Sequence, residues 1–212
     1  YAENIAAYSD RRGSEIEGEN KGGAIFNKTA PLSSVFNILN GNKQNYSYKF
    51  RMINEINYPS VENIPYTAGN YLDIKTRIGE QLKGIEIEKD YINSILHLLE
   101  STTTFVPSST NTMELMDISL YDHSKTTAAI ASCLYYYLQG EDYKRNLLTN
   151  GEKFKNEDAY LLYSCDISGI QNYIYTISGT KALKALRSRS LYLEILLENI
   201  ADDLLDRTGL TR

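Results

Sequence analysis

Apolar positions along this chain recur mainly with the spacing of α-helices. In residues 70–83 and 88–105 the apolar side chains return every third or fourth position, which predicts two amphipathic helices. Residues 119–138 are apolar around much of the helix circumference, which is typical of a central core helix. We expect a further long helix over 180–207, and residues 1–8 already have the apolar face of a helix. Most of the chain is therefore expected to be helical.

Two segments follow other patterns. Residues 159–165 (AYLLYSC) are almost continuously apolar, which predicts a strand buried on both faces of a sheet. Residues 45–57 alternate with a period of two, which predicts a hairpin or an edge strand. Pro31 stands at the first position of a short predicted helix that reaches Leu39. Since a helical part precedes a unit that starts with a strand, the expected fold class is α+β.

The two ends of the chain look cut. No capping residue precedes the helix predicted over 1–8, and only one long helix follows the strand predicted over 159–165. A lone buried strand leaves its backbone donors and acceptors unpaired on both edges. We therefore expect that these 212 residues are a fragment of a longer polypeptide.

Composition excludes several classes of protein. With 22 Lys and Arg against 27 Asp and Glu, the net charge is -5, which argues against nucleic-acid binding by the whole surface but leaves room for a local basic patch. The two cysteines form no CxxC pair and supply no zinc quartet, which fits a reducing compartment. No apolar run approaches the roughly 20 residues that span a bilayer. A cytoplasmic protein with no membrane contact is expected.

The chain has only two histidines, which excludes a multi-histidine metal site built from this sequence alone. His97 lies among leucines and is interpreted as a packed or solvent-edge residue. His123 lies beside Asp122 in the first turn of a predicted helix, where an imidazole could be held for metal binding. Equally, Asp122 or Ser119 could serve simply as the N-cap of that helix.

A second candidate site follows the predicted strand. Asp166 stands at its carboxyl end, where α/β sheets place ligand and metal groups, and Ser168 and Gly169 would offer backbone N–H groups to an anion. An Asx turn explains Asp166 equally well.

The long helix over 180–207 reverses the usual charge order. Basic residues occupy its first turns and acidic residues its second half, which opposes the helix macrodipole. We interpret the basic start as a contact for phosphate groups of RNA or of a nucleotide, and a solvated face with intrachain partners as the alternative. The bases are Lys181, Lys184, Arg187 and Arg189.

Six stretches, in this order, closely resemble the large signature subunit of the type III-A CRISPR effector complex, the Csm complex. They are AENIA at 2–6, SDRR at 9–12, FVPSSTN at 105–111, DISLYDHS at 117–124, DISGIQ at 166–171 and ALKALRSRS at 182–190. The resemblance runs from end to end of the chain.

The resemblance implies a fold and an activity. In that family an N-terminal HD nuclease domain cleaves single-stranded DNA with divalent metal ions (Mn, Ni or Mg), and two palm domains convert ATP, with Mg, to cyclic oligoadenylates when target RNA is bound. It implies that residues 1–150 are the later helices of the HD domain, with a flexible segment at about 13–30. Residues 151–212 would be a linker and the first strand and helix of a ferredoxin-like, cyclase-like palm. The implied partners are guide CRISPR RNA, target RNA, single-stranded DNA and other Csm subunits.

The family's tandem His-Asp motif and its Gly-Gly-Asp-Asp cyclase motif are absent from these residues, so the fragment alone is expected to be inactive. The metal ligands that the resemblance leaves here are Glu3, where the family pattern has a shorter Asp, and His123. The nucleotide- or RNA-binding residues that it implies are Asp166, Ser168, Gly169, Lys184, Arg187 and Arg189.

The leading hypothesis is thus part of an RNA-guided antiviral enzyme subunit, with nuclease and nucleotidyltransferase activity in the intact parent. The alternative is a non-catalytic scaffold segment whose basic helix start docks guide RNA or a neighbouring subunit. A self-standing HD phosphohydrolase acting on a small nucleotide is disfavoured, because it needs more histidines.

Overall fold

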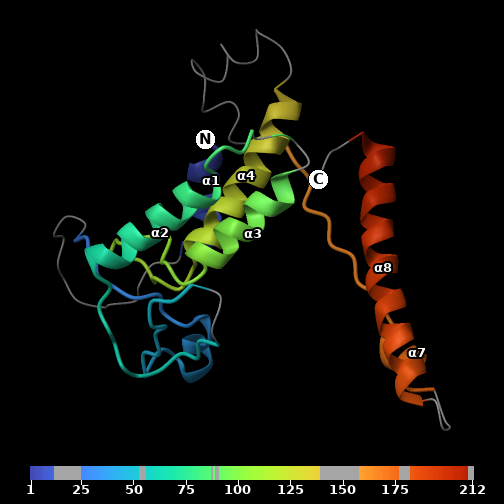
Figure 1. Ribbon diagram of the computed structural model, residues 1–212, viewed down its shortest axis with the longest axis horizontal. Helices are drawn as coiled ribbons and strands as arrows, with labels where there is room; N and C mark the ends of the chain where they lie inside the picture. The colour runs from blue at the N-terminus through green and yellow to red at the C-terminus, as the bar shows by residue number, and fades with distance from the viewer. Residues whose placement is uncertain are drawn as a thin grey trace. The chain divides into compact units, whose positions relative to one another are not determined.

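The computed structural model describes residues 1–11, 25–52, 56–86, 88, 91–138, 158–176 and 182–209. The chain divides into two compact units, Tyr1–Leu161 and Leu162–Arg212. The helices of the described residues are α1 (Ala2–Asp10), the 3-10 helix η1 (Val35–Asn40), α2 (Ala68–Gln81), α3 (Ile92–Thr103), α4 (Leu120–Tyr137), α7 (Ile170–Tyr175) and α8 (Ala182–Thr208) (Figure 1). None of these helices combines the length and the apolar composition that a membrane crossing requires.

The helices of the first unit pack as neighbours: α1 against α4, α2 against α3, and α3 against α4. The periodicity predicted α2, α3 and α4 correctly, and side-chain caps explain the starts of α2 and α4. Thr67 and Asn70 form a reciprocal capping box at the start of α2. Ala6 of α1 is fully buried, and α1 packs against α4. This packing brings residues of the two helices into contact.

The prediction that residues 119–138 form a central core helix is only half right. The helix exists, but among its residues only Tyr121, His123 and Ile130 are buried, and Tyr135 is 68% exposed. Its neighbours cover one stripe of α4, so the remaining apolar side chains of this helix face outward in the described structure.

Residues 25–52 and 56–66 form an irregular half of the first unit, which backbone hydrogen bonds to distant segments hold in place. Ser47 forms isolated antiparallel bridges with both Ser33 and Ser60, so three extended segments meet at one position. Tyr66, only 1% exposed, lies beneath them. Of the predicted flexible segment, residues 13–24 lie outside the described residues, while the backbone N–H of Asn27 donates to Thr110 at 2.7 Å.

Two short predictions in this half were wrong. The described part of 45–57 is not a regular strand: it pairs only through the isolated bridges at Ser47, and the N–H of Tyr46 donates to the side chain of Asn37 instead of to a neighbouring strand. The short helix begins at Val35 after the Ser34 cap, not at Pro31, because the backbone N–H of Ser33 donates to Met116 at 2.8 Å.

The predicted buried strand over 159–165 is also wrong for this structure. Residues 158–167 are described without strand or helix, and Leu161 and Leu162 are 87% and 91% exposed. A strand needs a hydrogen-bonded neighbour, and the described residues offer none to this segment. The described structure is therefore mainly helical, and the β part of the expected α+β fold is not seen in it.

The second unit contains α7 and α8 in contact with one another. No residue of either helix is buried, and α8 exposes Leu191, Tyr192 and Ile195. The prediction of a long helix over 180–207 is confirmed by α8.

Candidate functional site

The packing of α1 on α4 gathers titratable side chains that lie far apart in sequence. His123 Nδ1 lies 2.8 Å from Oδ2 of Asp10, and His123 Nε2 lies 3.7 Å from Oε1 of Glu3. The His123 side chain is 8% exposed and that of Asp10 is 17% exposed, whereas Glu3 is 57% exposed. The imidazole therefore stands between two carboxylates, one partly buried and one at the surface.

The start of α4 places His123 in this position. Ser119 Oγ accepts the backbone N–H of Asp122 at 3.0 Å and donates to the carboxylate of Asp122 at 2.6 Å. The N-cap reading of Ser119 is thus confirmed. It does not compete with the site reading of His123, because the cap fixes the first turn on which His123 stands.

A cation and a third carboxylate adjoin this group. A terminal nitrogen of Arg11 lies 3.3 Å from Oε1 of Glu3, and Arg11 Nε lies 4.0 Å from Oε2 of Glu114. Three carboxylates thus face one guanidinium and one imidazole. Three buried atoms of this group, Asp10 Oδ1, Arg11 Nε and Glu114 Oε2, have no hydrogen-bond partner. With His123 neutral, the group carries a net negative charge and would attract a cation.

The donor set fits a metal ion in part. Two donor atoms that each lie about 2.1 Å from one ion are about 3.0 to 3.5 Å apart, close to the separation of His123 Nε2 from Glu3. An imidazole whose other nitrogen bonds a carboxylate, as His123 does with Asp10, is the usual form of a metal-bound histidine. In the described part of the chain, however, no three His, Cys, Asp or Glu side chains are arranged to hold a metal. Glu3 and His123 can thus supply two ligands of a larger set.

In the second unit, the predicted site residues Asp166, Ser168 and Gly169 lie in the segment just before α7. Asp166 Oδ1 accepts the N–H of the adjacent Ile167 at 2.8 Å, so its bond is local, and both Asp166 and Ser168 are exposed. Gly169 caps α7 with φ at 79°, a left-handed conformation that glycine adopts without strain. These three residues are accessible, but the described structure brings no fourth group to them.

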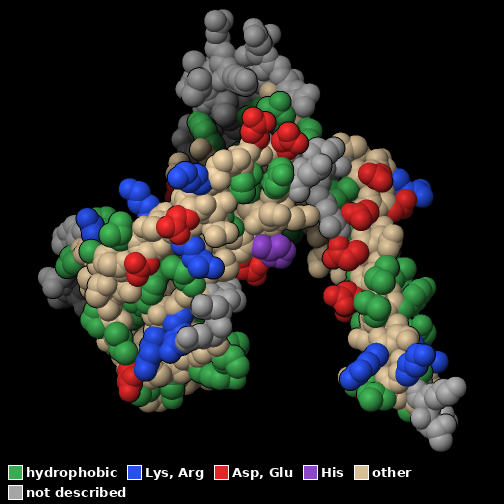
Figure 2. All heavy atoms as spheres, in the orientation of Figure 1, with side chains coloured by type: hydrophobic (Ala, Val, Ile, Leu, Met, Phe, Trp, Pro, Cys, Tyr) green, Lys and Arg blue, Asp and Glu red, His purple; other side chains and the backbone are tan. Residues whose placement is uncertain are grey.

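The basic residues of α8 divide into two kinds. Arg189 donates to the backbone carbonyl of Tyr173 and to Thr176 Oγ1, and its guanidinium lies 5.0 Å from the centre of the Tyr173 ring. Arg189 of α8 therefore links α8 to α7. Lys184 and Arg187 are exposed, and Figure 2 shows basic side chains gathered at the end of α8 that adjoins α7, with acids along much of the remaining length. Lys181 lies outside the described residues.

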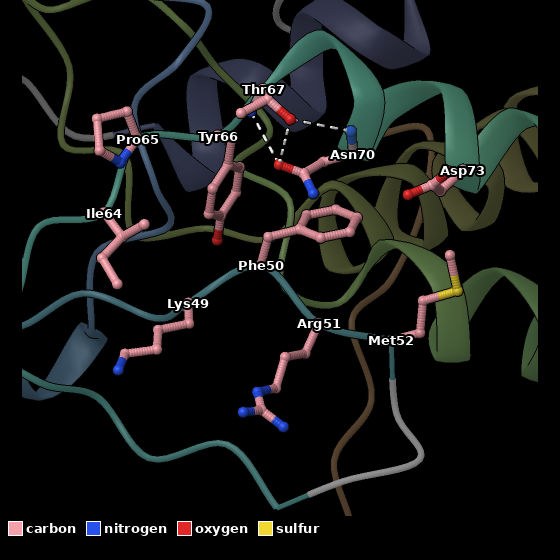
Figure 3. A pocket seen from close by; sticks show the side chains of 10 residues that line it. All are labelled: Lys49, Phe50, Arg51, Met52, Ile64, Pro65, Tyr66, Thr67, Asn70 and Asp73. Carbon is pink, nitrogen blue, oxygen red and sulfur yellow. Dashed lines mark hydrogen bonds between the residues drawn. The ribbon is translucent and has the colours of Figure 1, made fainter.

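Sequence reasoning missed a cavity of about 690 Å³ in the irregular half (Figure 3). Phe50 meets Tyr66 edge to face, with ring centres 5.4 Å apart, and Lys49 Nζ lies 2.9 Å from a carboxylate oxygen of Glu62. The Lys49 ammonium lowers the pKa of Glu62, through a hydrogen bond and through its charge. The cavity is lined by Lys49, Phe50, Arg51, Met52, Ile64, Pro65, Tyr66, Thr67, Asn70 and Asp73. These come from three segments with no shared motif, so no local signal could have revealed it.

Comparison with known proteins matches one family model to the end of the chain and longer proteins to the whole chain. A protein-family model described as Csm1 subunit domain B matches residues 159–212. The chain is 44% identical, over its whole length, to the "CRISPR system single-strand-specific deoxyribonuclease Cas10/Csm1 (subtype III-A)" of Enterococcus italicus, and 40% identical to the protein of the same description from Mycobacterium tuberculosis. It covers 29% and 27% of those two proteins, so it spans less than a third of their length.

A solved structure is similar as well. The chain matches a structure described as the Csm1-Csm4 cassette in complex with cA4 with a TM-score of 0.59 and 26% sequence identity. The match covers all of this chain and 24% of the solved one. The sequence comparison and the structure comparison therefore both find similarity to Csm1 proteins along the whole chain.

Proposed function

We propose that this chain contributes to an RNA-guided antiviral subunit that cuts single-stranded DNA. The proposal follows from its homology, over its full length, to part of the Cas10/Csm1 proteins of type III-A CRISPR systems. In this proposal residues 1–150 are the later helices of an HD-type nuclease domain. Residues 151–212 are a linker and the start of the first palm, which the match of 159–212 to domain B supports.

The observation that carries the nuclease proposal is the approach of His123 Nε2 to the Glu3 carboxylate across the α1–α4 contact. These two groups would hold a divalent metal ion, with further ligands from parts of the parent protein outside these 212 residues. A metal bound there would activate a water molecule for attack on a phosphodiester. Within this chain, Ser119 fixes the helix start that presents His123, and α1 presents Glu3.

The test uses the full-length protein with Mn²⁺ and a single-stranded DNA substrate. We expect His123→Ala to reduce the cleavage rate by more than the about 10- to 100-fold that loss of an outer-shell partner of a metal ligand costs. His97→Ala is the matched control, because His97 is an 81% exposed histidine on α3 that pairs with Glu100 on the surface. Cleavage by His123→Ala at the rate of the parent would remove His123 from the nuclease site.

In this proposal the second unit takes part in contacts with nucleotides and RNA. In the intact parent the palms convert ATP, with Mg, to cyclic oligoadenylates when target RNA is bound. The cA4 complex of the similar Csm1-Csm4 structure supports this reading. Of the residues proposed for RNA or nucleotide contact, Lys184 and Arg187 are exposed bases of α8, while Asp166, Ser168 and Gly169 would contribute backbone and side-chain groups from the segment before α7.

The scaffold alternative, in which this basic helix start docks guide RNA or a neighbouring subunit, has its own test. Changing both Lys184 and Arg187 to Ala should weaken assembly of the complex on guide RNA and flatten its dependence on salt, because fewer phosphates are neutralised. Arg207→Ala is the control, since Arg207 lies at the other end of α8 and pairs with Asp203 at 2.7 Å. Equal assembly of the double variant and the parent would contradict this role.

A further inference from the structure

The bond between Asp10 and His123 has a direction that matters for metal binding. An ionised carboxylate only accepts hydrogen bonds, so His123 Nδ1 carries the proton and donates it to Asp10 Oδ2 at 2.8 Å. The neutral ring then has its lone pair on Nε2. That atom is the one turned toward Glu3.

Stability alone does not account for this arrangement. The second carboxylate oxygen of Asp10 is buried without a hydrogen-bond partner, and a buried, half-satisfied carboxylate costs stability. Replacing such a pair by apolar side chains of similar volume is often neutral or stabilising. What the pair does fix is the orientation and the tautomer of the His123 ring.

We infer that Asp10 is a positioning residue, which holds the His123 ring with Nε2 free and directed toward Glu3 and so raises the affinity of this centre for a divalent cation. The inference rests on the proposed role of His123 as a metal ligand. The inference adds Asp10 to the predicted metal-site residues Glu3 and His123. A carboxylate behind a metal-bound imidazole also makes the ring a stronger donor, and its loss commonly lowers metal affinity about 10- to 100-fold.

Asp10→Asn is the decisive variant, because it keeps the size of the side chain. The amide can donate to Nδ1 and thereby move the ring proton to Nε2, the atom needed for the metal. The full-length protein is titrated with Mn²⁺, and free Mn²⁺ is followed by electron paramagnetic resonance, which needs no turnover. We expect Asp10→Asn to weaken by about 10- to 100-fold the binding event that His123→Ala abolishes.

Glu100→Ala provides the matched control, since Glu100 also bonds a histidine Nδ1, that of His97, at 3.3 Å, but on the exposed surface of α3. It should leave Mn²⁺ affinity unchanged. Hydrogen exchange of the amides of α1 and α4 in Asp10→Asn should match that of the parent, which separates a change of tautomer from a loss of packing.

The outcomes distinguish the two claims. If His123→Ala weakens Mn²⁺ binding and Asp10→Asn does not, the role of Asp10 is overturned while the proposed nuclease site stands. If His123→Ala also leaves Mn²⁺ binding unchanged, His123 is no ligand and both claims fail. If Asp10→Asn weakens binding only together with faster exchange in α1, the role of Asp10 is structural and the inference is overturned.

Discussion

The hydroxyl of Tyr66 lies 2.7 Å from the backbone carbonyl oxygen of Phe105, across 39 positions of sequence. The same hydroxyl lies 3.0 Å from the carbonyl oxygen of Tyr48 and 3.4 Å from the backbone nitrogen of Leu32. One buried side chain thus joins three segments, because the irregular half of the first unit has no sheet to satisfy its backbone. Burial raises the pKa of Tyr66 to about 12.

Tyr66→Phe should destabilise the first unit by about 1 to 3 kcal/mol, the usual cost of leaving buried polar groups without a partner. Hydrogen exchange of the full-length protein should quicken around Leu32, Tyr48 and Phe105. Tyr71→Phe is the control, because the Tyr71 hydroxyl makes a single, solvent-accessible bond to the carbonyl of Lys28 at 3.1 Å. Equal effects of the two substitutions would contradict the role given to Tyr66.

The raised pKa of Tyr66 predicts sensitivity to alkali. In the unfolded chain the phenol has its ordinary pKa near 10, whereas desolvation holds it at about 12 in the folded chain. The folded state therefore binds the proton more tightly, so its stability is complete below pH 10 and falls as the pH rises from 10 toward 12. Burial of Tyr71 raises its pKa and acts in the same direction. Unfolding in urea at pH 9 and pH 11 measures the effect, which Tyr66→Phe should reduce.

The Ser119 cap should control the geometry of the candidate metal centre. Ser119→Ala removes the acceptor for the Asp122 N–H and should cost about 0.5 to 2 kcal/mol at the start of α4. Amide exchange in residues 120–124 should rise, and Mn²⁺ affinity should fall modestly. Ser132→Ala serves for comparison, because the Ser132 hydroxyl bonds only the carbonyl of Ala128 on the exposed face of the same helix. Unchanged exchange near Ser119 would show that tertiary packing alone sets this helix start.

Arg189 and Arg187 should respond differently to substitution, although they lie two positions apart. Arg189→Lys loses the planar guanidinium that contacts both Tyr173 and Thr176, so amides of α7 should exchange faster. Arg187→Ala should leave α7 unchanged and alter only binding to RNA or a partner. Exchange mass spectrometry of residues 170–176 separates the two, and equal protection in both variants would count against the fastening role of Arg189.

Local sequence predicted the parts of the fold that local sequence determines. Helices α2, α3, α4 and α8 lie close to their predicted ranges, since their apolar side chains recur every three to four positions, and caps add a start signal for α2 and α4. The irregular half was not predictable, because Asn37 and Tyr66 act through partners that are remote in sequence. The period-two pattern at 45–57 marked an extended segment, but not how few of its residues would pair.

The residues of the candidate metal centre were likewise only partly predictable from the sequence. His123 stood out because it lies beside Asp122 after a capping serine, and Glu3 came from the resemblance. Asp10 lies in the stretch SDRR of the resemblance, but no role was assigned to it, since its importance depends on how α1 packs on α4. The charge pattern also grouped Arg189 with Lys184 and Arg187 as a phosphate contact. In the structure, Arg189 instead donates a hydrogen bond to Thr176 of the same unit.

The 113 positions between Asp10 and His123 impose an order on biosynthesis. Translation yields α1 early and α4 late, so a nascent chain stalled anywhere before residue 123 holds the aspartate without the ring it aligns. An unfinished chain therefore cannot assemble this centre. Any cation affinity of the centre arises only after α4 has been made and has packed on α1.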